Sequence, residues 1–116
     1  MESNIPIYLQ IAHSIENEII NNRLSIDDQV PSTNEFSKSM NVNPATAGKG
    51  LNELVNQGIL YKKRGVGMFV TEKAKRIIIS KRKEYFTRNL LQDFLNEAEL
   101  LNISKEELIE MVRSEY

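Results

Sequence analysis

The stretch from Asn41 to Gly58, NVNPATAGKGLNELVNQG, decides the fold. Asn43 belongs to the residue types that cap the start of a helix. Pro44 suits the first helical position, because its missing N–H needs no partner there. Gly58 is typical of the position at which a helix stops. The stretch therefore predicts a helix from Pro44 to about Gln57.

Two glycines, Gly48 and Gly50, lie in this helix, although an interior glycine costs roughly 0.5–1 kcal/mol relative to alanine. On a helical wheel the apolar side holds Ala47, Leu51, Leu54 and Val55. The opposite side holds Ala45, Lys49, Asn52, Glu53 and Asn56, with Thr46 at its edge. Gly50 flanks the apolar side, where we expect the preceding helix of a pair to cross closely. Gly48 flanks the other side, where another surface can approach, and a DNA groove is a candidate.

A capping box precedes this helix. Ser32 is followed three residues later by Glu35, which predicts that a helix begins here, with Phe36 and Met40 turned inward. A tight turn then leads to Asn43. Two short helices joined by three or four residues form the outline of a helix-turn-helix.

Farther upstream, apolar residues at helical spacing predict an amphipathic helix from Ile7 to about Asn21. The connection that follows lacks glycine. Asn22 and Asp27 are residue types that tolerate positive φ, so we expect them to fill the turn positions.

Downstream, Ile59–Lys63 and Met68–Thr71 are short β-type runs, and Arg64–Gly67 is the turn between them. A hairpin directly after a helix-turn-helix is a wing. The predicted fold is therefore mainly α with a small β-wing, in a winged helix-turn-helix spanning residues 1–72.

Residues 73–116 are expected to form a two-helix tail. A long helical pattern begins near Lys75, breaks at Asn102, and is followed by a helix opened by Ser104 with Glu107. Two helices of this length cannot bury a core of their own. The wide apolar face of the longer one therefore predicts a homodimer interface, formed by Phe86, Leu90, Leu91, Phe94, Leu95 and Ala98.

Length and composition indicate one small domain, or one with an appendage: 116 residues, 41% hydrophobic. No apolar run approaches the roughly 18 residues that span a membrane, and the start does not resemble a secretory signal. The absence of cysteine excludes disulfides, thiolate metal ligands and a cysteine nucleophile. We therefore expect a cytoplasmic protein with no membrane partner, no metal and no cofactor.

Positive charge is concentrated in the middle of the chain. Residues 1–72 carry six lysines and arginines against eight acids, and residues 73–116 carry nine against eight. Three cations are adjacent at Lys62, Lys63 and Arg64, where the wing context favours phosphate contact. Six more fall between Lys73 and Lys83 with no acid among them. These six are equally compatible with a solvated helix face and with a stripe along a DNA backbone.

The order of motifs resembles the winged helix-turn-helix of the GntR family of bacterial transcription regulators. The motifs are PIYLQIA at the start, VPS before the second helix, VNPAT and LNELVNQGIL in the third, and RGVGMFV at the wing. The short two-helix tail is most similar to the YtrA-like subfamily. The resemblance implies a homodimeric regulator that binds double-stranded DNA and represses a neighbouring transporter-type operon.

The resemblance also implies where DNA binds. The second helix of the motif would lie in the major groove, opened by Asn43 and Thr46, while Ser32 and Thr33 would meet a phosphate. The wing turn would touch the minor groove or its backbone. The DNA-binding candidates are Ser32, Thr33, Asn34, Asn43, Ala45, Thr46, Gly48, Lys49, Asn52, Lys63, Arg64, Gly65 and Gly67.

Three positions depart from the family pattern, which usually has arginine where this chain has Asn34, often where it has Pro44, and a basic residue at Gly48. Guanine reading by a bidentate arginine is therefore absent from this helix. Together with the net charge of the first 72 residues, this keeps a second reading open, a winged-helix interaction module with weak or lost DNA binding.

An enzyme is not expected. No nucleophile–base set or metal cluster can be assembled, and the GKG of the third helix lacks the spacing of a phosphate loop. His13 has no ligand-type neighbour at a suitable spacing and is expected on the solvent side of the first helix. A small-molecule effector cannot be identified from the sequence.

Overall fold

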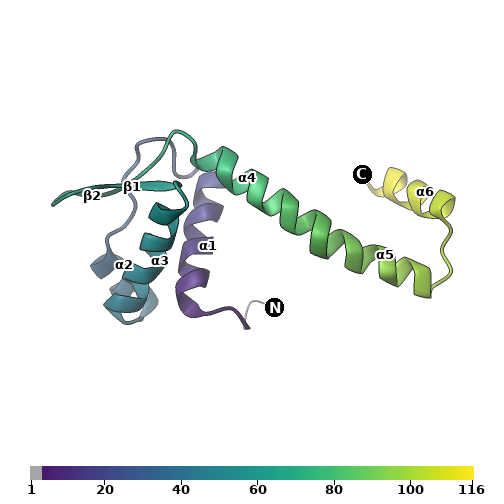
Figure 1. Ribbon diagram of the computed structural model, residues 1–116, viewed down its shortest axis with the longest axis horizontal. Coiled ribbons are helices and arrows are strands. Elements are labelled where there is room, and N and C mark those ends of the chain that lie inside the picture. Colours follow the sequence, from purple (N-terminus) through teal and green to yellow (C-terminus); the bar gives the residue numbers. More distant parts are fainter. Residues whose placement is uncertain (1–3) are drawn as a thin grey trace. The chain divides into compact units, whose positions relative to one another are not determined.

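The computed structural model describes residues 4–116, so residues 1–3, with which the predicted first domain begins, lie outside the described residues. Contacts divide the chain into a first compact unit ending at Ser80 and a second from Lys81 to Tyr116. The elements, shown in Figure 1, are α1 (Ile7–Ile20), α2 (Thr33–Met40), α3 (Pro44–Asn56), β1 (Leu60–Lys63), β2 (Gly67–Val70), α4 (Ala74–Tyr85), the π-helical η2 (Phe86–Leu90), α5 (Leu91–Leu100) and α6 (Lys105–Glu115).

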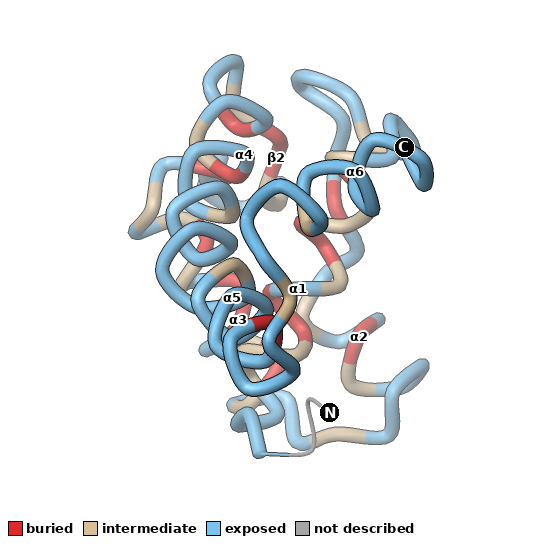
Figure 2. Tube along the Cα trace, turned by 90° about the vertical axis from the view of Figure 1, so that its right-hand side faces the viewer, coloured by how far each residue is buried: buried red, intermediate tan, exposed pale blue. Residues whose placement is uncertain are grey.

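The first unit is the predicted winged helix-turn-helix. Helix α3 packs against both α1 and α2, and β1 follows it into the hairpin. The core is built from the apolar faces of these elements, and its largest fully buried side chains are Ile11, Leu51, Leu54, Ile59, Leu60, Val70 and Ile78. In Figure 2, short buried stretches mark α2 and β2, whereas no stretch of α6 is buried.

Local capping works as the sequence predicts. The Ser32 hydroxyl accepts the Glu35 N–H at 3.1 Å, and the Glu35 carboxylate accepts the Ser32 N–H at 2.7 Å, which completes the capping box of α2. The Asn43 side chain accepts the Ala45 N–H at 2.7 Å and caps α3. Asn22 and Asp27 adopt φ of 64° and 68°, as expected for turns without glycine.

The prediction that Met40 points inward is wrong. Met40 is 42% exposed, whereas Phe36, one turn earlier, is buried. Helix α2 has eight residues and ends at Met40, because Asn41 takes up the left-handed conformation with φ of 53°. The chain then turns, and Val42 packs against the core.

The hairpin carries a third short extended segment that the sequence did not reveal. Strands β1 and β2 pair antiparallel with Leu60 opposite Val70 and Lys63 opposite Gly67. On the other edge of β2, Gln29 forms an antiparallel bridge with Phe69. The Val30 N–H donates to the Met68 carbonyl at 2.9 Å. Residues 27–30 therefore attach the lead into α2 directly to the wing.

The first unit extends eight residues beyond the predicted boundary at Glu72. Ala74 and Ile78, both on α4, are buried in the same core as α1 and α3. Their spacing of four residues places them on one face of the helix. The first turns of α4 therefore belong to the winged unit.

The second unit begins within α4, and η2 and α5 continue the helix without a break in sequence. In η2 the Thr87 hydroxyl donates to the Lys83 carbonyl at 3.0 Å, and the Asn89 amide donates to the Tyr85 carbonyl at 3.2 Å. Helix α6 opens as predicted, with the Ser104 hydroxyl accepting the Glu107 N–H at 3.1 Å.

Candidate nucleic-acid interface

A groove of about 450 Å³ lies between the start of α2 and the wing. One wall comes from the residues before and within the first turn of α2, and the other from the hairpin turn. It is lined by Pro31, Ser32, Thr33, Asn34, Leu51, Lys62, Lys63, Arg64, Gly65, Val66, Gly67 and Met68. Seven of the predicted DNA-binding residues, from two separate motifs, thus share one concave surface: Ser32, Thr33, Asn34, Lys63, Arg64, Gly65 and Gly67.

The α2 wall offers hydrogen-bond donors. The first N–H groups of a helix have no acceptor within the helix, and the positive end of its dipole favours an anion there. Ser32 and Asn34 are exposed, and Thr33 is half-buried. The Ser32 hydroxyl uses its oxygen to accept the Glu35 N–H, which leaves its own hydrogen available to donate.

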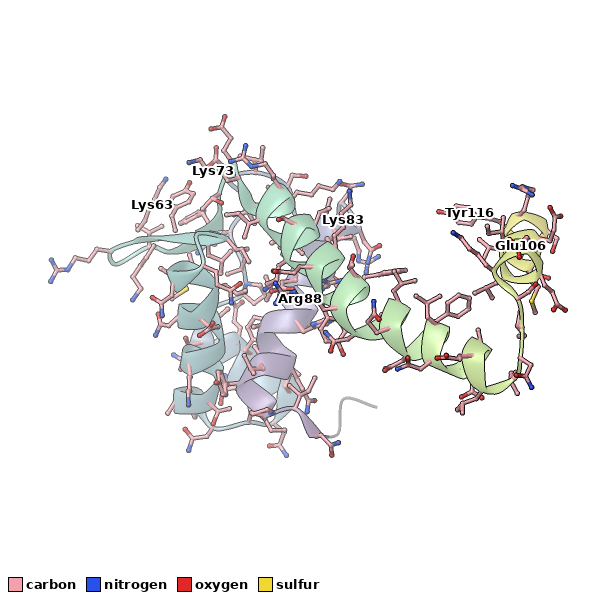
Figure 3. The ribbon with its side chains drawn as sticks, turned by 45° about the vertical axis from the view of Figure 1, so that its right-hand side comes forward. Lys63, Lys73, Lys83, Arg88, Glu106 and Tyr116 are labelled. Atoms are coloured by element: carbon pink, nitrogen blue, oxygen red, sulfur yellow. The ribbon has the colours of Figure 1, made fainter. Side chains whose placement is uncertain are left out.

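The wing wall offers cations. Lys62, Lys63 and Arg64 are exposed, and Lys63 is labelled on the hairpin in Figure 3. The Lys63 ammonium lies 4.8 Å from the centre of the Phe69 ring. Phe69 stacks in turn on Tyr61, with ring centres 5.6 Å apart. Lys63 is therefore held at the surface of the sheet rather than extended into solvent.

Tyr61 ties this aromatic pair to the connection before α2. Its hydroxyl donates to the Asp27 carboxylate at 2.9 Å. That hydrogen bond, with desolvation and the Asp27 charge as smaller causes, raises the pKa of Tyr61 above its ordinary value. The Tyr61 hydroxyl therefore links the aromatic pair to the connection before α2.

On α3, the solvent face carries the remaining candidates. Asn43, Ala45, Lys49 and Asn52 are exposed, while Thr46 and Gly48 are half-buried. The Lys49 ammonium lies 4.2 Å from the centre of the Tyr8 ring of α1. This cation–π contact was not predicted, because Tyr8 and Lys49 are far apart in the sequence.

Gly50 of α3 faces a different helix from the one expected, and Gly48, expected beside an approaching surface such as a DNA groove, lies near α2. A Cβ on Gly50 would lie 2.6 Å from the Tyr8 carbonyl oxygen, so the close crossing is with α1 and not with α2. A Cβ on Gly48 would lie 3.8 Å from the Thr33 side chain of α2, an ordinary contact. The reason is the position of α1, which covers the side of α3 that carries Gly50.

Several acids of the first unit, most of them exposed, also make hydrogen bonds or an ion pair that build the fold. Glu35 accepts the Ser32 N–H, Asp28 accepts the Ser25 N–H, and Asp27 accepts the Tyr61 hydroxyl. Glu18 pairs with Arg23 at 3.1 Å. Residues 1–72 carry two more acids than bases, but the residues that line the groove include three adjacent cations and no acid, so the net charge of this part of the chain does not describe the charge at the groove.

In the second unit, four predicted interface residues are substantially exposed. Phe86, Leu90, Phe94 and Leu95 are between 40% and 53% exposed, and Leu91 is half-buried. Ala98 differs, being only 6% exposed in the single chain. The Ile103 N–H donates to the Ala98 carbonyl where the chain turns after α5.

Within residues 4–116, no group of three or more His, Cys, Asp or Glu side chains is placed to hold a metal ion. His13 is exposed on α1, as predicted. Among these described residues, no helix has the length and apolar character needed to cross a membrane.

The family model described as "Bacterial regulatory proteins, gntR family" matches residues 7–70. The chain is 34% identical to the HTH-type transcriptional regulator YhcF of Bacillus subtilis, over 97% of the chain and 92% of that protein. It is 27% identical to the HTH-type transcriptional repressor YtrA of the same organism, over 96% of the chain and 85% of that protein.

Two solved structures are also similar. A GntR family transcriptional regulator from Listeria monocytogenes has 30% identity and a TM-score of 0.73, covering 98% of each chain. The AraR DNA-binding domain in complex with operator ORX1 has 33% identity and a TM-score of 0.56, covering 58% of this chain and 82% of that one. The matched part of the AraR complex is comparable in length to the first unit.

Proposed function

The chain belongs to the gntR family of bacterial regulatory proteins, and from this premise we propose that it is a homodimeric repressor of a neighbouring, transporter-type operon. Membership of this family establishes that the chain is a DNA-binding transcriptional regulator and not an enzyme. The relative YtrA is named as a transcriptional repressor, and it matches 96% of this chain. This supports repression rather than activation.

The observation that carries the proposed DNA interface is the groove between α2 and the wing. A helix start with available donors and a wing with three adjacent cations line one concave surface, which is the chemistry that binds a phosphate backbone. The wing and the first turn of α2 then position the domain on the duplex. Helix α3, which follows α2 by a short turn, lies in the major groove.

Base reading in this proposal falls to the exposed polar residues of α3. Asn52 can pair with adenine through its amide, and the Asn43 amide nitrogen can donate while its oxygen caps the helix. Thr46 lies within the first turn of α3 and offers a hydroxyl. Lys49 is drawn toward Tyr8, so it can supply charge beside the helix more readily than a base contact.

The proposed dimer uses the apolar face of η2 and α5. Four large apolar side chains there are about half exposed in the single chain, which is uncommon for a contiguous face of a monomer. A second copy related by a two-fold axis would cover this face and present two recognition helices to a symmetric operator. Occupation of a promoter by this pair is the proposed mechanism of repression.

The alternative, a winged-helix interaction module with weak or lost DNA binding, is suggested by the net charge of residues 1–72 and by the missing arginines. The residues that line the groove include three cations and no acid, so this net charge does not argue against an anionic partner there. The missing arginines affect base reading, whereas the phosphate contacts come from the wing and α2. We therefore favour DNA binding.

The test replaces Lys63 and Arg64 with alanine and measures binding to the region upstream of the gene and to a mixed-sequence duplex. If both cations contact phosphates, affinity for both probes should fall, and the slope of log affinity against log salt should become shallower by about two charges. A matched control, Lys105→Ala with Arg113→Ala on α6, removes the same charge from exposed sites of the second unit.

A loss of discrimination between the two probes with an unchanged salt slope would assign base reading, not phosphate binding, to the wing. Binding that is equally weak for the unmodified protein and the double variant, at low salt, would instead favour the interaction module.

A further inference from the structure

Gln29 is held at the edge of the wing by its backbone. Gln29 forms an antiparallel bridge with Phe69 of β2. The residues on either side of Gln29 make two further hydrogen bonds to the same strand. The Val30 N–H donates to the Met68 carbonyl at 2.9 Å, and the Val70 N–H donates to the Asp28 carbonyl at 3.0 Å. The side chain of Gln29 therefore leaves from a fixed point.

That side chain reaches into the wing turn. The Gln29 amide donates to the Val66 carbonyl at 3.0 Å, between residues that are 37 positions apart. A Cβ on Gly67 would lie 2.4 Å from the Gln29 amide nitrogen and 3.4 Å from its Cδ. Gly67 also has a backbone φ of 148°, which residues with a side chain rarely adopt. The glycine thus gives the amide room to lie against the backbone of the turn.

The turn has few other restraints. The Val66 N–H donates to the Lys63 carbonyl at 2.9 Å within the turn itself. Gly65 has open space around it, and Val66 is exposed. The Gln29 side chain therefore joins the tip of the wing to the rest of the unit by a hydrogen bond.

Gln29 also stands three residues before Ser32. The same short segment thus leads into the start of α2 and restrains the wing turn, and these are the two walls of the groove. We infer that Gln29 is a positioning residue for DNA binding, which holds the wing turn that carries Arg64 at a fixed separation from the first turn of α2. This inference rests on the proposed phosphate contact of the wing.

The role predicts an effect that is unusual for an uncharged residue. Removing the amide leaves every cation in the chain but loosens the turn that carries Arg64. Fewer phosphates are then neutralised in the average complex, so fewer counterions are released and the salt slope becomes shallower. A direct hydrogen bond from a neutral amide to DNA releases no counterion, so its loss would lower affinity without changing the slope.

The experiment uses the full chain with Gln29→Met, which keeps the length of the side chain and removes the donor. Binding to a labelled mixed-sequence duplex is measured across a range of salt concentrations. We expect affinity to fall roughly three- to tenfold, the range for one lost hydrogen bond. We also expect a shallower salt slope. Gln10→Met is the matched control, because the Gln10 amide also donates to a backbone carbonyl, that of Ile5 before the start of α1.

The second arm combines Gln29→Met with Lys63→Ala and Arg64→Ala. If Gln29 acts through the wing cations, its substitution should add little once they are removed, whereas a direct contact would contribute its full effect again. An unchanged salt slope or full additivity would overturn the inference.

Two outcomes separate this inference from the proposed function. If Lys63→Ala with Arg64→Ala weakens binding and Gln29→Met does not, the positioning role is wrong and the wing contact stands. If neither weakens binding, the wing contact fails and the inference fails with it.

Discussion

At the scale of single residues, Gly48 and Gly50 differ in what surrounds them. A Cβ on Gly50 meets the Tyr8 carbonyl at 2.6 Å and the Ile11 side chain at 3.2 Å, so a substitution must displace the backbone of α1. A Cβ on Gly48 makes only an ordinary contact with Thr33. The cost of glycine in a helix is therefore offset by close packing at position 50 and not at position 48.

We predict opposite effects for the two alanine variants. Gly50→Ala should destabilise the first unit by about 1–3 kcal/mol, because overpacking at a backbone outweighs the gain in helix propensity. Gly48→Ala should be neutral or stabilise it by up to about 1 kcal/mol. Thermal or denaturant unfolding of the two variants checks this, each serving as the control for the other. Effects of the same sign would contradict the geometry of the α1–α3 crossing.

At the scale of elements, the start of α4 belongs to the winged unit. Substitution of two adjacent isoleucines in α4, one buried and one exposed, tests this assignment. Ile78 is fully buried, and its neighbour Ile79 is 38% exposed. Ile78→Ala should cost about 2–5 kcal/mol of the free energy of unfolding, whereas Ile79→Ala should cost much less. Chemical denaturation of both variants measures the difference. Similar losses would mean that α4 does not contribute Ile78 to this core.

The elements that follow from local patterns could be predicted from the sequence. The caps at Ser32 and Asn43, the hairpin turn and the amphipathic helix α1 each depend on residues close together in the chain. The boundary inside α4 could not, because apolar residues at positions 74, 77 and 78 fit equally well to a core and to a separate tail. Only their packing against the core decides between these.

Three further features depend on geometry that periodicity does not encode. The pairing of residues 27–30 with β2 could not be predicted, because Asp27, Asp28 and Gln29 lack the alternating apolar pattern of a strand. The π-helical η2 could not be predicted either, because the spacing of its apolar residues also fits an α-helix. For the candidate site, the two walls of the groove were each predicted, whereas Gln29 was missed. The only sequence signal for Gln29 is Gly67. A glycine there indicates that some group lies close to the backbone, but it does not indicate which residue supplies that group.

At the scale of the whole molecule, the apolar face of η2 and α5 predicts the oligomeric state. Leu90→Glu with Phe94→Glu should yield a monomer whose winged unit remains folded, because neither residue belongs to the core of that unit. DNA affinity should fall by about two orders of magnitude or more, because a single half-site loses the linked second contact. Sedimentation and thermal unfolding, with DNA binding measured in parallel, test these expectations.

Gln92→Glu with Asn96→Glu is the matched control, since it adds the same charge to exposed residues of α5 outside the predicted face. This control should remain dimeric. An unmodified protein that sediments as a monomer, at concentrations where it binds DNA, would overturn the proposed dimer.

The attachment of residues 27–30 to β2 also has a consequence for the order in which the first unit assembles. Helix α3 and the hairpin are consecutive in the chain, so their contacts form between near neighbours. Gln29 and Phe69 are forty positions apart, and joining them requires closure of a long loop. The groove should therefore form late during folding and open first under native conditions, before the core unfolds. In native-state hydrogen exchange, the amide protons of Asp27 and Val30, which donate to β2, should exchange sooner than that of Leu54 in the buried face of α3.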